Sequence, residues 1–96
     1  MSKLEQFSNP AIVYERAKRI YGPDVEIEYS TRKNKKYMLF NPNSGKWVHF
    51  GSMNPPMKDY TKHGDEIRRK KFQQRNHKWA SAPKYSASFN SYYLLW

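Results

Sequence analysis

Five turn-forming residues separate two apolar segments near the middle of the chain, and they constrain its fold more than any other feature. Residues 37–40 (Tyr-Met-Leu-Phe) and 46–50 (Lys-Trp-Val-His-Phe) flank residues 41–45 (Asn-Pro-Asn-Ser-Gly). Because proline fixes φ and glycine permits a positive φ, this arrangement predicts a β-hairpin. Over residues 25–30, apolar and polar side chains alternate, which indicates a further half-buried strand. We therefore predict a three-stranded antiparallel β-meander.

The segment before the first strand is typical of an amphipathic helix. Asn9 can cap it, Pro10 occupies its first position, and Gly22-Pro23 ends it. Its apolar residues share one stripe, formed by Val13, Ala17 and Ile20. Such a stripe needs a packing surface, so we expect this helix to lie across one face of the sheet. Residues 1–8 are expected to form a flexible arm, with Leu4 and Phe7 as its anchors.

Two more helical segments are expected after the sheet. A second, basic helix should begin near Asp65, continue to about Asn76 and pack through Ile67 and Phe72. Ser86 or Ser88 could cap a short helical turn in the tail, whose large apolar residues are Phe89, Tyr92, Tyr93 and Trp96. The tail either folds back onto the sheet or docks on a partner. Folding back is favoured, since a small core needs every ring available.

Length and composition limit the chain to one small α+β domain, which we place at residues 9–96. Its 96 residues include no cysteine, so neither disulfides nor thiolate metal sites can supplement the core. Aromatic residues make up 17% of the chain and supply the apolar bulk instead. No apolar run approaches the roughly 20 residues of a membrane-spanning helix, and the N-terminus lacks a hydrophobic signal segment. We expect a protein that is not secreted.

Positive charge is concentrated in the second two-thirds of the chain. The formal net charge is +10, but residues 1–30 hold four basic and five acidic side chains, whereas residues 31–96 hold fourteen basic and three acidic ones. Such an excess repels itself in a folded protein unless a polyanion offsets it. The sequence therefore predicts a non-enzymatic protein that binds a polyanion, with nucleic acid as the favoured partner and DNA favoured over RNA.

Basic residues interleaved with aromatic residues identify the candidate binding surface. The candidate phosphate-binding residues are Arg32, Lys33, Lys35, Lys36, Lys46, Arg68, Arg69, Lys70, Lys71, Arg75 and Lys78. The candidate stacking residues are Trp47, Phe72 and Trp79, for which a place in the core is the favoured alternative. Arg68, Phe72, Arg75 and Trp79 would share one stripe if the second helix extends that far. Nothing in the sequence specifies a base, so sequence-independent binding is expected.

The three histidines are the natural candidates for metal binding or catalysis. His49, His63 and His77 show no recognised ligand spacing, although His63 and Asp65 lie in a loop composition that a nuclease could use. No nucleophile elbow or glycine-rich phosphate loop is present. We therefore expect no catalytic residue, no metal and no cofactor, and an enzyme is the weakest hypothesis for this chain.

Four segments together resemble a known family. They are residues 30–38, residues 45–51, residues 60–69 and the terminal residues 92–96. Over about residues 25–96 the chain is similar to small basic proteins of unknown function encoded by large DNA viruses of algae and amoebae. The resemblance implies a viral protein in a virion or in the cytoplasm or nucleus of an infected cell, and it implies no catalytic residues. The alternative to genome binding is then a minor structural component that docks on acidic capsid proteins or membrane headgroups.

Overall fold

The predicted meander forms the centre of the fold. The computed structural model describes residues 3–96, and its sheet has the order β1 (Ile27–Tyr29), β2 (Lys35–Asn41) and β3 (Lys46–Ser52), all antiparallel. Tyr37 pairs with Tyr29 on one side and with Phe50 on the other. The amide of Gly45 (φ 72°) donates to the Asn41 carbonyl at 2.8 Å and closes the hairpin loop. The α+β fold predicted from the sequence is confirmed.

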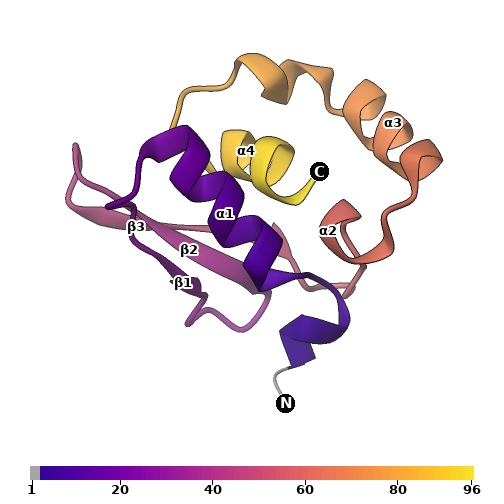
Figure 1. Ribbon diagram of the computed structural model, residues 1–96, viewed down its shortest axis with the longest axis horizontal. Coiled ribbons are helices and arrows are strands. Elements are labelled where there is room, and N and C mark those ends of the chain that lie inside the picture. The colour runs from indigo at the N-terminus through magenta and orange to yellow at the C-terminus, as the bar shows by residue number, and fades with distance from the viewer. Residues whose placement is uncertain (1–2) are drawn as a thin grey trace.

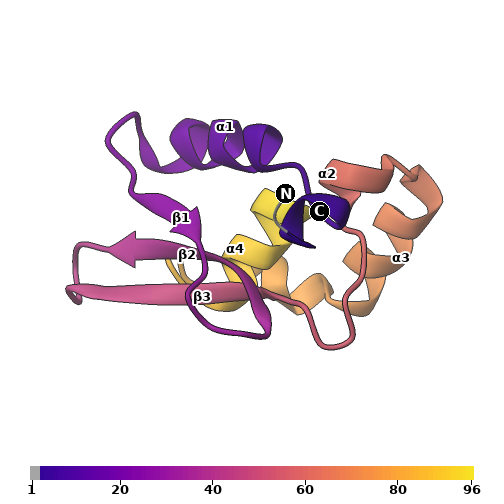
Figure 2. The same cartoon turned by 90° about the horizontal axis from the view of Figure 1, so that it is seen from below.

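Helix α1 (Pro10–Tyr21) covers one face of the sheet (Figures 1 and 2). The Asn9 side chain accepts the Ala11 amide, and the Gly22 amide donates to the Lys18 carbonyl, so both predicted ends are confirmed. Val13 and Ala17 are fully buried against β2 and β3, where Tyr37, Leu39 and Phe50 are also fully buried. Because side chains alternate along a strand, Phe40 and Trp47 face away from α1, with ring centroids 5.4 Å apart.

The C-terminal segment folds back into the core between α1 and the helices beyond the sheet (Figures 1 and 2). It comprises helix α4 (Ala87–Asn90), capped by Ser86, and the π-helical turn η3 (Ser91–Leu95). Leu94 and Leu95 are buried within the same cluster as the residues of α1 and the sheet. The tail is therefore part of the core rather than a free docking segment.

The remaining helices lie past the end of the strands (Figure 2). They are α2 (Tyr60–His63), α3 (Glu66–Arg75) and the 3-10 helix η2 (His77–Ser81). The Asp65 carboxylate accepts the amides of Ile67 and Arg68, as expected for the cap of the second helix. Ile67, however, was predicted as a packing residue and is 67% exposed.

The start of the chain also differs from expectation within its described part. Where a loose arm was predicted over residues 1–8, a 3-10 helix, η1 (Lys3–Gln6), leads into a packed turn, while residues 1–2 lie outside the described residues. Leu4 is buried in the core and Ser8 is 1% exposed, so this segment is anchored on the domain. Among residues 3–96, none of the helices has the length and apolar character needed to cross a bilayer.

Candidate functional site

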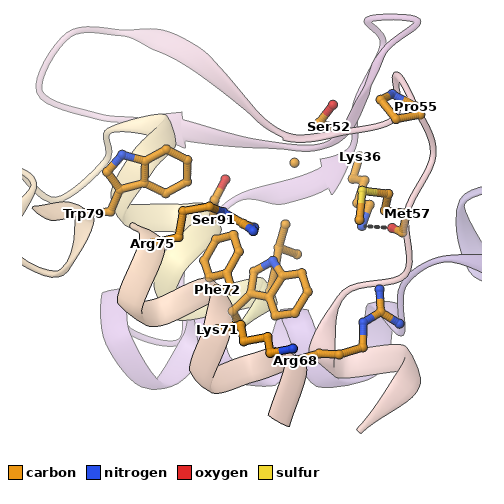
Figure 3. Close-up of a pocket in the computed structure, with 13 residues that line it drawn as sticks. Lys36, Ser52, Pro55, Met57, Arg68, Lys71, Phe72, Arg75, Trp79 and Ser91 are labelled. Carbon is orange, nitrogen blue, oxygen red and sulfur yellow. Dashed lines mark hydrogen bonds between the residues drawn. The ribbon is translucent and has the colours of Figure 1, made fainter. Parts of the chain in front are cut away.

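A cavity of about 320 Å³ opens between α3, the end of β3 with the loop that follows it, and the C-terminal segment (Figure 3). We call it the α3 groove. Its lining comes from four parts of the chain: Lys36 of β2; Gly51, Ser52, Pro55 and Met57 of β3 and its loop; Arg68, Lys71, Phe72, Arg75 and Trp79 of α3 and η2; and Ser91, Leu95 and Trp96 of the tail. The groove is therefore a product of tertiary packing.

The floor of the α3 groove is aromatic. The Phe72 ring stacks on Trp96, with centroids 4.4 Å apart and planes within 7° of parallel, and Trp79 meets Phe72 edge to face at 5.9 Å. Phe72 is buried, whereas Trp79 and Trp96 are half-buried. The predicted stripe thus converges on one site, although α3 ends at Arg75 and Trp79 comes from η2.

Three cations of α3 form the rim of the groove. Arg68, Lys71 and Arg75 follow one another at i, i+3 and i+7, which places them on one face of the helix (Figure 3). All three are exposed, and none forms an ion pair with a carboxylate within residues 3–96. The Arg75 guanidinium lies 5.9 Å from the Phe72 ring centroid, so the rim adjoins the aromatic floor directly. A row of cations without a carboxylate partner among the described residues therefore lies along one side of an apolar surface.

Lys36, predicted to bind a polyanion, is instead buried in a polar network. It is 4% exposed, and its ammonium donates to Asp59 at 3.0 Å and to the Met57 carbonyl at 2.8 Å. Burial lowers the pKa of Lys36, and the adjacent Asp59 carboxylate opposes that shift. Because its charge is satisfied inside the protein, Lys36 is removed from the binding surface.

The same network continues through three hydroxyl groups. Thr61 Oγ1 donates to Asp59, so the Ser8 hydroxyl, 3.2 Å away, donates to Thr61, and the Tyr37 phenol donates to Ser8 at 2.7 Å. Burial raises the pKa of the Tyr37 phenol, which keeps it protonated as the first donor. This series of hydrogen bonds ends at one fully buried carboxylate, and it connects the turn after η1, through Ser8, with β2 and α2.

Arg69 also differs from its predicted role. Its Nε donates to the Trp96 carbonyl at 2.7 Å, its guanidinium lies 4.6 Å from the Tyr60 ring centroid, and it pairs with Glu66 at 3.6 Å. These contacts direct Arg69 into a separate hollow beside α1, which Arg16 also lines. Arg69 therefore fastens the tail to α3 rather than forming the rim.

The other predicted cations are exposed but are not gathered at the groove. Lys70 and Lys78 are exposed on α3 and η2 without lining it. Arg32, Lys33 and Lys35 lie along a shallow hollow beside the loop between β1 and β2. Lys46 begins β3 at the hairpin loop, and Trp47 lies on the outer face of the sheet. The candidate phosphate-binding residues therefore do not form one continuous surface.

The histidines take part in local hydrogen bonds. His63 Nδ1 accepts the Asp65 amide at 2.8 Å, while the Asp65 carboxylate caps α3. His49 Nδ1 lies 2.7 Å from the Ser30 hydroxyl, and His77 Nδ1 lies 3.3 Å from the Gln74 carbonyl. Across residues 3–96, no group of three or more His, Cys, Asp or Glu side chains is placed to hold a metal ion.

The wall opposite α3 was missed by sequence reasoning. Gly51 lies so close to the tail that an added Cβ would come within 2.9 Å of both Leu95 and Lys36, and its φ is 81°. This close approach lets the end of β3 and the tail share one wall. The turn residues after β3 predict only irregular backbone, so nothing in them indicates that they face α3.

A comparison of the sequence with protein families gives a match over residues 25–79, more than half of the chain. The matched segment contains the sheet, the rim cations, Phe72 and Trp79, and it ends before the tail, which the sequence resemblance had included. Searches of curated proteins and of solved structures found no match. On the extent of the family match, the chain belongs to DUF5754, a family of unknown function.

Proposed function

We propose that this protein is a non-enzymatic, sequence-independent nucleic-acid-binding protein that contacts phosphates through the rim of the α3 groove. The observation that carries the proposal is the row of Arg68, Lys71 and Arg75, which are exposed on one helix face and have no carboxylate partner within residues 3–96. Unpaired cations in a row match the regular charges of a phosphate backbone, and their binding releases counterions.

The remaining charge supports the same partner. The formal net charge of +10 attracts any polyanion over a long range, and the exposed lysines outside the groove add to that field. Base-specific readout needs side chains that pair with base edges, typically by bidentate hydrogen bonds. Mobile arginine and lysine side chains on an exposed rim favour phosphate contacts instead, hence binding without sequence preference.

The resemblance to small basic proteins of large DNA viruses supports a finer proposal. The nucleic acid would then be a viral genome, and the protein would be found in the virion or in the infected cell. The same exposed cations would also suit the alternative partners, which are acidic capsid proteins or anionic membrane headgroups.

The proposal is tested by removing the rim charges. We expect the triple substitution Arg68→Gln, Lys71→Gln and Arg75→Gln to weaken binding of a labelled oligonucleotide, measured by fluorescence anisotropy over a series of salt concentrations. The slope of log K against log salt is negative, and its magnitude should decrease by about two to three, since each phosphate contact contributes roughly 0.7 to 0.9.

A matched control removes the same charge elsewhere. Lys18, Lys62 and Lys84 are exposed and lie outside the groove, and changing all three to Gln should alter the slope far less. Equal losses in both triple variants would show that the diffuse field binds rather than the rim. Absence of nucleic-acid binding by the natural protein would overturn the proposal and favour the capsid or membrane alternative.

A further inference from the structure

The α3 groove has more apolar surface than phosphate binding requires. A phosphate is bound by cations and hydrogen-bond donors, yet beneath this rim lie Phe72, Trp79 and Trp96, together with Leu95. Aromatic rings contribute to nucleic-acid binding when they contact the face of a base. In a duplex those faces are covered by neighbouring bases, so they are available only when a base is unpaired and unstacked.

From this combination we infer that the α3 groove holds one unpaired base of a single strand, while the rim holds the adjacent phosphates; the inference rests on the proposed function. Single-stranded nucleic acid is thereby the preferred ligand over duplex. The floor supplies the stacking surface, through Trp79 and the exposed part of Trp96, and the charge of the rim is complementary to the strand.

The size of the groove fits this occupant. A cavity of about 320 Å³ lies at the lower end of the roughly 300–1,000 Å³ typical of small-ligand sites, a size compatible with a single base. Arg75 follows Arg68 by seven positions of α3, so the rim extends about 10 Å along the helix. The rim cations can therefore contact the phosphates that precede and follow the bound base.

The polar groups in the wall do not select one base. Ser52 from β3 and Ser91 from the tail both line the groove (Figure 3), but the Ser52 hydroxyl already hydrogen bonds with the backbone of Asn54, which leaves the Ser91 hydroxyl as the polar group of the wall. A hydroxyl can donate or accept, so it can satisfy the edge of any base. The Lys36 ammonium in the same wall is hydrogen-bonded to Met57 and Asp59, so a pocket with an aromatic floor and one hydroxyl group at its wall is expected to accept all four bases.

The test compares two single strands that carry the same phosphates. One is a thymidine 12-mer, and the other is a 12-mer of abasic residues, which keeps the backbone and lacks the bases. We expect the natural protein to bind the thymidine strand about 5- to 150-fold more tightly, the range given by stacking of one base on an aromatic side chain. A duplex of equal length, although it carries more phosphates, should bind less tightly than the thymidine strand, because its base faces are covered.

The variant Trp79→Ala should abolish this preference, because it should weaken binding of the thymidine strand far more than binding of the abasic strand. Trp79 is half-buried in a short 3-10 helix, and Trp47→Ala is the matched control, because Trp47 lies on the outer face of the sheet, away from the groove. Trp79→Phe should restore most of the preference. If Trp79→Ala unfolds, a second measurement uses the natural protein. Its tryptophan fluorescence should be quenched by the thymidine strand and not by the abasic strand, and equal quenching by both would overturn the inference.

The outcomes separate the inference from the function on which it rests. Equal affinity of the natural protein for the thymidine and abasic strands would overturn the inference while leaving phosphate binding by the rim intact. Loss of both affinities to the same degree in Trp79→Ala would also overturn it, since the ring would then serve only to position the rim. Failure of the natural protein to bind either strand would overturn both.

Discussion

The buried network around Asp59 and the α3 groove both use basic residues, but they use positive charge in opposite ways. In the network, Lys36 is 4% exposed and contacts a carboxylate that is itself fully buried. At the rim of the groove, Arg68, Lys71 and Arg75 are exposed and have no carboxylate partner within residues 3–96. A paired, buried charge is satisfied by the fold, whereas a row of unpaired cations is stabilised by an external anion.

This difference shows why net charge alone overestimates a binding surface. Lys36 belongs to a run of basic residues in the sequence, and Arg69 lies between two exposed basic residues of α3. Both are nevertheless held by contacts within the protein, Lys36 by Asp59 and Arg69 by the Trp96 carbonyl. Burial and pairing, rather than position in a basic run, identify the cations that are free to bind.

The largest expected effect comes from breaking the network. Lys36→Met removes the ammonium and leaves the Asp59 carboxylate buried, with hydrogen bonds from the Thr61 amide and hydroxyl in place of a charged partner. Removal of one partner of a buried pair costs about 3–5 kcal/mol, which we expect as a loss in the free energy of unfolding measured with urea. Arg68→Gln at the groove should change it by less than about 0.5 kcal/mol.

A second substitution tests the cause of that loss. Asp59→Asn removes the uncompensated charge and keeps a side chain that can cap α2. The double variant with Lys36→Met should therefore be more stable than the sum of the two single losses predicts. Strict additivity would show that the Lys36–Asp59 contact contributes little, and the contrast between the two regions would lose its basis.

The fold could be predicted from the sequence because its signals are local. Helix boundaries are specified by side chains that accept nearby backbone amides, as Asn9, Asp65 and Ser86 do. The hairpin is specified in the same local way by the turn formers of residues 41–45. The α3 side of the groove could also be predicted, because the spacing of its basic and aromatic residues along one predicted helix already indicated Phe72 and Trp79.

The rest of the site depends on contacts between distant segments. Asp59 lies 23 residues after Lys36 in an irregular stretch, so no pattern in the sequence pairs them. The wall opposite α3 exists because the end of β3 meets the tail at Gly51. Ile67 was misassigned because its apolar side chain was taken as evidence of burial, although folded proteins expose many apolar atoms.

A smaller, pH-dependent effect is expected at His63, which lies between the two regions. Its ring lies 5.2 Å from the Trp96 ring of the groove. Burial, followed by the charge of Arg68, lowers the pKa of His63 below its ordinary value of 6.5, while Asp65 and Asp59 oppose that shift. The neutral ring is also required because its Nδ1 accepts the Asp65 amide.

The sign of the effect follows from proton binding. Below the ordinary histidine pKa, the unfolded chain binds a proton at His63 more readily than the folded protein does, so the free energy of unfolding falls as the pH decreases. We expect the loss between about pH 7.5 and about pH 5 to be smaller in His63→Gln than in the natural protein. Identical pH dependence of the two proteins in urea denaturation would show that His63 does not couple the regions.

The smallest effect is expected at Ile67, and it sharpens the distinction between the face of α3 that packs and the faces that do not. Ile67 is 67% exposed and does not line the groove, whereas Phe72 on the same helix is buried beneath the rim. Ile67→Gln should therefore change the free energy of unfolding by less than about 0.5 kcal/mol and leave oligonucleotide affinity unchanged. A loss approaching that of Phe72→Ala, about 3–5 kcal/mol, would place Ile67 in a packed seam and restore the original sequence prediction.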